Sequence, residues 1–241
     1  MAGLRPTFTL SRRSGFTLLE MMVVVAIISI LSAMAAMTAQ EIGSRNAIQN
    51  AASDISTILQ NARARAEQKG SDVYVIVYPR MTKAGALTGG KGALFVYEDY
   101  NGDFLTGSGA CDSTVNDCSF ASFVPPSAIY PLGSSKDKLV QALYLDDYPK
   151  QNVQFGKLST LTWTLPFTSI GTSADTNGCT FCTSGKGVIV FTGEQQLRFL
   201  NNTGAPVAQR VAGLAVQGVL KPESTYLFGM VGATGLVTLV K

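Results

Sequence analysis

The chain has 241 residues, of which 46% are apolar and 15% are charged, and its formal net charge is +3. This length suits one substantial domain with extra elements, or two small ones. The absence of histidine excludes Ser-His-Asp and Cys-His catalysis and removes the commonest metal ligand. The small net charge leaves no basic patch of the kind that indicates a nucleic-acid-binding protein.

The positive charge is concentrated before a long apolar segment. Residues 1–15 contain Arg5, Arg12 and Arg13 and no acid, whereas basic and acidic residues are equal in number in the rest of the chain. Residues 21–39 contain no charge and no proline. A helix of that length rises about 30 Å, close to the hydrocarbon thickness of a bilayer. The positive-inside rule therefore predicts a single-pass protein with a cytoplasmic N-terminus and an exported C-terminal part.

The apolar run continues into a segment of good helix formers, residues 40–68. Apolar or small side chains recur there at steps of three and four, which place them on one face of a helix. These residues are Ile48, Ala51, Ala52, Ile55, Ile58, Ala62 and Ala66. We expect one helix from Phe16 to about Gln68, ended by Gly70. Its first half is apolar on all sides and its second half is amphipathic.

A strand-rich region follows the helix. β-Branched and aromatic residues bounded by Gly and Pro predict strands. The segments are 72–78, 93–97, 139–145, 153–155, 161–165, 187–191, 195–200, 211–216, 226–231 and 236–240. Hairpin turns are expected at 192–194 and 232–235, and an irregular inserted loop at 98–131. The predicted fold class is α+β, with the amphipathic half of the helix packed on an antiparallel β domain.

The segment Ser14-Gly15-Phe16-Thr17-Leu18-Leu19-Glu20, followed by the apolar helix, resembles the prepilin signature of type IV pilins and type II secretion pseudopilins. The resemblance covers about the first quarter of the chain. It implies cleavage between Gly15 and Phe16 by a prepilin peptidase, followed by N-methylation of Phe16. The implied organisation is a leader at 1–15, a transmembrane and assembly half-helix at 16–40, an amphipathic half-helix at 41–70 and a periplasmic β-rich domain at 71–241.

Glu20 is the acid near the start of the apolar helix. A carboxylate deep in a bilayer costs on the order of 2.5–3.5 kcal/mol unless it lies near the interface or is paired. The available cation is the α-amino group of Phe16, from the same subunit or the next one. In the resembling family this pairing is intersubunit and sets register during assembly. A neighbour that supplies an ammonium within about 4 Å relieves the cost of the buried charge.

The arrangement of strands and the turn at residues 99–103 resemble the GspH/FimT group of minor pilins. The resemblance implies a minor pilin of a type IV pilus that primes assembly or lies near the tip. The alternative is a minor pseudopilin of a type II secretion system. The implied partners are other pilins or pseudopilins, the prepilin peptidase and an inner-membrane assembly platform. The implied location is the inner membrane and then the filament, and no cofactor is expected.

The four cysteines form two couples, Cys111 with Cys118 and Cys179 with Cys182. In an oxidising compartment each couple predicts a local disulfide. Pairing across the couples stays open, and so does zinc, although the two couples lie outside the usual zinc-ribbon spacing.

A calcium site is a weaker candidate. Asp99, Asn101 and Asp103 match the first three ligand positions of an EF-hand-like loop, but Phe104 and Ala110 stand where that loop needs Gly and Glu. Such turns are also ordinary, so no metal is the preferred interpretation.

Two other classes of function remain as alternatives. An enzyme would need carboxylate, Lys or Tyr chemistry, and the chain shows no Walker A loop, nucleotide fingerprint or recognisable acid pair. An adhesive or DNA-binding minor pilin would fit part of the resembling group. However, the C-terminal region supplies only Lys221 and Lys241 as basic residues after residue 220. We therefore expect a structural protein.

Overall fold

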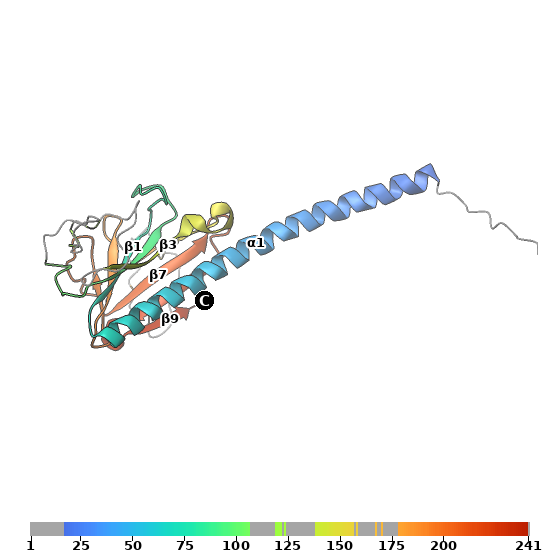
Figure 1. Ribbon diagram of the computed structural model, residues 1–241. Coiled ribbons are helices and arrows are strands. Elements are labelled where there is room, and N and C mark those ends of the chain that lie inside the picture. Colours follow the sequence, from blue (N-terminus) through green and yellow to red (C-terminus); the bar gives the residue numbers. More distant parts are fainter. Residues whose placement is uncertain are drawn as a thin grey trace, which may run out of the picture. The chain divides into compact units, whose positions relative to one another are not determined.

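The computed structural model describes residues 17–106, 119–121, 123, 138–156, 158, 167, 170 and 178–240, and within these it leaves out the side chains of residues 36–42 and 240. The predicted strand at 161–165 lies outside the described residues. The chain divides into two units, Met1–Ile42 and Gly43–Lys241. We call them the N-terminal and the C-terminal unit and describe each by itself. Helix α1 (Leu18–Lys69) contributes to both (Figure 1).

Local hydrogen bonds explain where α1 begins and ends. At its start the Thr17 hydroxyl accepts a hydrogen bond of 3.2 Å from the backbone N–H of Glu20. This is the N-cap half of a Thr-x-x-Glu capping box. At its end the N–H of Gly70 donates to the Ala66 carbonyl at 2.9 Å. Gly70 has φ +65°, the left-handed conformation that commonly stops a helix. The predicted end at Gly70 is confirmed.

The amphipathic pattern of α1 is also confirmed in the C-terminal unit. Every residue of the predicted apolar face is at most 2% exposed: Ile48, Ala51, Ala52, Ile55, Ile58, Ala62 and Ala66. The opposite face carries exposed polar residues such as Arg45, Asn50 and Asp54. Burying this apolar face against the sheets supplies the packing energy that propensity alone does not provide.

The described strands form two antiparallel sheets. The first sheet has the order β3-β2-β1-β5-β6 and the second β4-β7-β8-β9. Their bounds are β1 Val73–Tyr78, β2 Ala93–Glu98, β3 Lys138–Tyr144, β4 Val153–Phe155, β5 Gly187–Phe191, β6 Leu197–Leu200, β7 Val211–Gly218, β8 Thr225–Val231 and β9 Leu236–Val240. Figure 1 shows that the part of α1 in the C-terminal unit lies along strand β7 of the second sheet.

Both faces of β1 are covered, which explains why this strand is buried along its whole length. Because side chains alternate along a strand, Val73, Val75 and Val77 join the core under α1. Tyr74 and Ile76 instead join an aromatic cluster with Phe104, Phe120 and Phe123 on the other face. The second sheet repeats this plan, since Leu158, Phe167 and Ile170 cover the face that points away from α1.

The structure confirms the α+β class and the antiparallel strands. The clearest difference lies in β6, which begins at Leu197 and not at the predicted residue 195. Gln195 takes a left-handed φ of +64°, and its N–H donates to the Thr192 carbonyl at 3.0 Å. The β5–β6 turn therefore includes residue 195, which cannot extend the strand. The turn between β8 and β9 is a short 3-10 helix, η4 (Gly232–Thr234).

Candidate functional site

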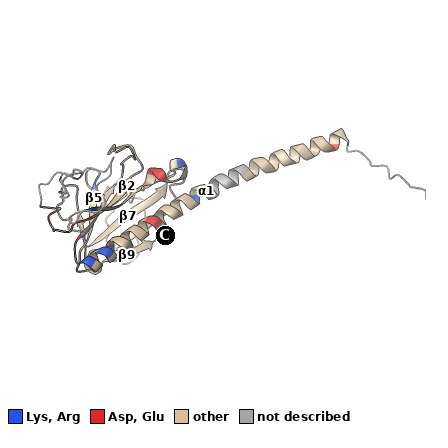
Figure 2. Cartoon of the chain, in the orientation of Figure 1, with Lys and Arg blue, Asp and Glu red and all other residues tan. Residues whose placement is uncertain are grey.

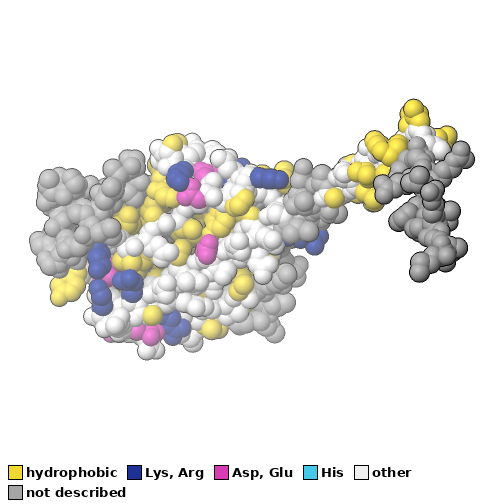
Figure 3. All heavy atoms as spheres, turned by 45° about the vertical axis from the view of Figure 1, so that its right-hand side comes forward, with side chains coloured by type: hydrophobic (Ala, Val, Ile, Leu, Met, Phe, Trp, Pro, Cys, Tyr) yellow, Lys and Arg dark blue, Asp and Glu magenta, His cyan; other side chains and the backbone are white. Residues whose placement is uncertain are grey.

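The N-terminal unit carries an apolar helical surface. In residues 18–35 the mean hydropathy is 2.4, and none of this window is buried. This is the one helix among the described residues that is long and apolar enough to cross a membrane. Figure 3 shows its apolar side chains on the surface. A surface of this kind is stable against lipid or against other apolar helices.

Glu20 is the only charged residue in this window (Figure 2). It lies in the first turn of α1, where a negative charge is favoured by the positive end of the helix dipole. Gly15 and Phe16 lie outside the described residues. Their cleavage and methylation, and the pairing of Glu20 with an α-amino group, stay predictions.

In the C-terminal unit, Asn152 links the first helical residues of this unit to the β7–β8 loop. Its side-chain amide donates to the Ser44 hydroxyl of α1, and its side-chain oxygen accepts from the Leu220 N–H at 3.1 Å. Its backbone carbonyl accepts from the Val219 N–H at 2.9 Å. Asn152 is 2% exposed, and replacing its side chain would take this partner from the Ser44 hydroxyl and the Leu220 N–H. The hydrogen bonds fix the β7–β8 loop beside residue 44.

At the other end of α1 a buried carboxylate is surrounded by cations. Glu98, on β2, is 2% exposed and forms an ion pair with Lys69. Arg65 lies 3.7 Å and Lys138 4.0 Å from its other oxygen. A buried carboxylate is costly unless it is paired. This group of charges therefore fixes the last turn of α1 against β2 and β3.

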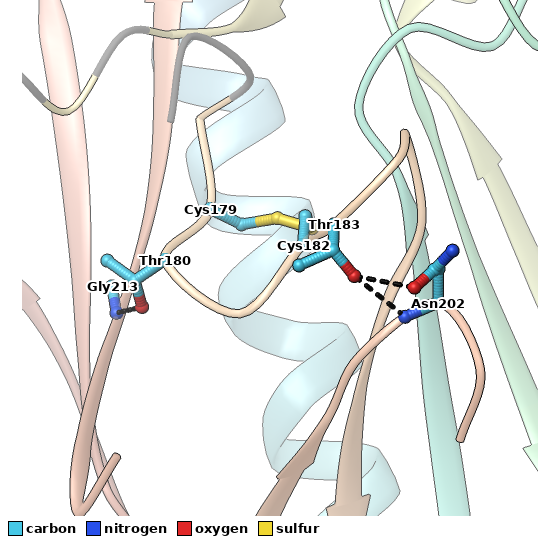
Figure 4. Close-up of a disulfide and its surroundings, with 6 residues drawn as sticks. All are labelled: Cys179, Thr180, Cys182, Thr183, Asn202 and Gly213. Atoms are coloured by element: carbon cyan, nitrogen blue, oxygen red, sulfur yellow. Dashed lines mark hydrogen bonds between the residues drawn. A yellow bond between two sulfur atoms is a disulfide. The ribbon is translucent and has the colours of Figure 1, made fainter. Parts of the chain in front are cut away.

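Cys179 and Cys182 are joined by a disulfide (Figure 4). The Thr180 hydroxyl accepts from the Gly213 N–H of β7 at 3.0 Å. The Thr183 hydroxyl donates to the side-chain oxygen of Asn202 at 2.7 Å. The disulfide thus lies in a turn that bridges β7 and the loop after β6. Cys111 and Cys118 lie outside the described residues, so their pairing stays a prediction.

Lys186 ends the same turn and contacts the aromatic cluster. Its ammonium lies 3.6 Å from the ring centre of Phe120 and donates to the Phe120 carbonyl at 3.3 Å. A cation over an aromatic face is attracted by the electrons of the ring. Burial lowers the pKa of Lys186 to about 8. Lys186 therefore connects the cysteine turn to the segment after Cys118.

The calcium candidates occupy one turn, but Asp99 already has partners there. Its two carboxylate oxygens accept from the N–H groups of Gly102 at 2.7 Å and Phe104 at 3.2 Å. Burial and the neighbouring carboxylate of Asp99 raise the pKa of Tyr74, whose hydroxyl also bonds to Asp99. Among the described residues no group of three or more His, Cys, Asp or Glu side chains is arranged to hold a metal.

Sequence reasoning did not find Asn152, Glu98 or Lys186. Each makes contacts between segments far apart in the chain, and no local pattern indicates such contacts. A weak signal existed for Glu98, because a charged residue at the end of an apolar strand needs a partner when it is buried.

Comparison with known proteins gives one match. Residues 10–36 match the prokaryotic N-terminal methylation motif. No curated protein matches the chain, and no solved structure does. The matched segment contains Gly15, Phe16 and Glu20 and ends within the apolar helix. The motif points to a structural protein. The chain therefore carries the prepilin-type signature, which is typical of type IV pilin-like and pseudopilin proteins.

Proposed function

We propose that the chain is a minor pilin, a structural subunit of a type IV pilus that primes assembly or lies near the tip. The observation that carries this proposal is the methylation motif at residues 10–36, which leads into an exposed apolar helix with Glu20 as its one charge. The subunit waits in the inner membrane with its C-terminal domain in the periplasm. It then moves from lipid into a bundle of similar helices.

Assembly follows from the energetics of the helix. Lipid and neighbouring helices are equally apolar, so burial of apolar surface does not drive the transfer. A carboxylate in the apolar layer does distinguish the two environments, because an ammonium from a neighbouring subunit relieves its cost. In this proposal that ammonium is the N-methylated terminus at Phe16, created when the leader is removed. The partners are other pilins, the peptidase and the assembly platform.

A minor pseudopilin of a type II secretion system is the second candidate, because the same motif and the same helix serve both systems. Microscopy with an antibody against the C-terminal domain separates the two. Label on extracellular pili supports the pilin. Loss of protein secretion without loss of pili, after deletion of the chain, supports the pseudopilin.

The processing step is tested by intact-mass spectrometry of the membrane form. In cells with an active prepilin peptidase we expect residues 16–241 with one added methyl group. Gly15→Leu should leave the leader attached, because the peptidase would cut after Gly15. Gly3→Leu changes the same residue type within the leader and should be processed normally. An unprocessed wild-type chain that begins at Met1 in these cells would overturn the processing claim.

A further inference from the structure

The end of the C-terminal unit that carries residue 44 combines an exposed apolar side chain with basic residues. Leu220 is 74% exposed, although its N–H bonds to Asn152, which also bonds to Ser44. Lys150 lies two residues before Asn152, Lys221 follows Leu220, and Arg45 follows Ser44. We call Arg45, Lys150, Leu220 and Lys221 the junction patch.

The backbone of the patch is held in place. In the β7–β8 loop the Ser224 N–H donates to the Lys221 carbonyl at 3.0 Å, and the Gly218 N–H donates to the Ser224 carbonyl at 3.1 Å. A Cβ at Gly218, the last residue of β7, would lie 2.8 Å from Ile48 of α1, so the strand end that begins the loop packs closely on the helix. Leu220 is therefore exposed by a fixed loop.

The turn that carries Lys150 has an unusual backbone. Lys150 and Gln151 are consecutive non-glycine residues with positive φ, +59° and +48°. Such residues are uncommon and are concentrated at functional sites. Glycine would relieve the strain, yet the chain places a lysine at this exposed position. The conformation presents a cation at the end of the unit where α1 enters.

Chain length brings this end close to the membrane. The apolar run ends at Ala39 and Ser44 is five residues later, a rise of about 8 Å along α1. The headgroup layer of a bilayer is about 5–8 Å thick on each side. A groove of about 380 Å³ also opens here, lined by Arg45, Gln49 and Ser224 among others.

From these observations we infer that the junction patch docks on the anionic phospholipid surface of the periplasmic leaflet before assembly. Leu220 enters the headgroup boundary, and the exposed Lys150 contacts lipid phosphates. Glu223, on the same loop, is exposed and opposes part of this charge, whereas the exposed Asp147, three residues before Lys150, is paired with Lys83. This inference rests on the proposed membrane-anchored stage of the subunit. Docking would hold the domain in one orientation until a neighbouring subunit replaces the lipid.

The test is photo-crosslinking of the full chain in vesicles of phosphatidylethanolamine and phosphatidylglycerol. A photoreactive amino acid replaces Leu220, Ala233 or Ile28 in separate variants. Ala233 is an exposed control in η4, beyond the opposite end of β7 and β8, about 23 Å away along the strands. Ile28 lies in the apolar helix and reports on anchoring.

We expect lipid adducts at Ile28 and Leu220, and severalfold fewer at Ala233. Lys150→Gln should lower the yield of lipid adducts at position 220 about fivefold, because one cation near an anionic surface contributes about 1 kcal/mol. Arg210→Gln, an exposed cation beside the β8–β9 turn, should leave it unchanged. Vesicles of phosphatidylcholine alone should lower the yield as well.

The outcomes separate the two proposals. Adducts at Ile28 but not at Leu220, or adducts of Leu220 with protein only, would overturn the docking and leave the proposed function intact. If the yield of lipid adducts at position 220 were the same in vesicles of phosphatidylcholine alone, the proposed role of anionic lipid would also be overturned. An absence of adducts at Ile28 would contradict membrane anchoring itself.

Discussion

At the residue scale, the ion pairs of the C-terminal unit differ in burial and therefore in energy. Glu98 is 2% exposed, whereas Arg63 and Glu67, one turn apart on α1, form a pair whose side chains are 36% and 34% exposed. Exposed pairs contribute little because water screens them. Removing one partner of a buried pair is costly, because it leaves charge without compensation. Glu98 should therefore matter much more for stability than Glu67.

We expect Glu98→Gln to lower the free energy of unfolding by about 2–3 kcal/mol. Glu67→Gln is the matched control and should cost about 0.5 kcal/mol or less. Urea denaturation of the full chain in detergent measures both. Equal effects of the two changes would show that Glu98 does not hold the helix end as described.

Lys186 gives a pH dependence with a defined sign. Its pKa is lowered to about 8 in the folded protein from an ordinary value of 10.5. Between these values the unfolded chain binds the proton and the folded chain does not. The contribution of Lys186 to the free energy of unfolding therefore rises as the pH increases from about 8 to about 10.5. Burial raises the pKa of Tyr74 and Tyr148, which acts in the opposite direction above pH 10.

The measurement compares the wild type with Lys186→Met at each pH, so that the tyrosine effects cancel. We expect the stability of the wild type relative to the variant to increase between about pH 8 and 10. A difference that is constant over this interval would mean that Lys186 titrates normally and is not buried as described.

At the element scale, helix α1 could be predicted almost to the residue. Its two patterns, apolar on all sides and then apolar on one face, are local and depend only on helical periodicity. Gly70 marks the end because a left-handed residue without a side chain stops the helix at little cost. Strand β5 was also predicted correctly at residues 187–191, because the run of β-branched residues after Gly187 is a local pattern too.

Gly70→Ala should destabilise the protein by about 1 kcal/mol, because φ is +65° there and alanine rarely adopts that conformation. Gly43→Ala is the control within the same helix, where φ is ordinary and nothing lies within 4 Å of the added Cβ. It should not lower stability. Thermal unfolding of both variants tests the end of the helix. A neutral Gly70→Ala variant would contradict it.

At the scale of the whole molecule, sequence patterns predicted the elements but not their assembly. The strand pattern does not show which strands share a sheet. The pairing of β1 with β5, for example, joins residues that are more than a hundred positions apart in the sequence. The contacts of Asn152 with Ser44 and Leu220 are equally remote in sequence. For the candidate site, the motif and Glu20 were found from sequence because their signature is local and continuous.

The division into two units has a physical basis in the sequence. The described residues of the N-terminal unit bury no side chain, whereas the C-terminal unit contains the two-sided core. In the proposed function the first unit is stabilised by an external partner, first lipid and then other helices, whereas the second unit is stabilised by its own packing. A subunit that moves between a membrane and a filament needs both properties.

The most direct test of this account measures incorporation of Glu20→Ala into sheared filaments, with Glu67→Ala as the control acid on the same helix. Quantitative immunoblots of filament and membrane fractions give the incorporated share, and mass spectrometry of the same samples gives the processed share. We predict that Glu20→Ala lowers incorporation at least about tenfold, because the ammonium of its neighbour loses its partner, while Glu67→Ala incorporates normally. Incorporation of Glu20→Ala at the wild-type level would contradict the account.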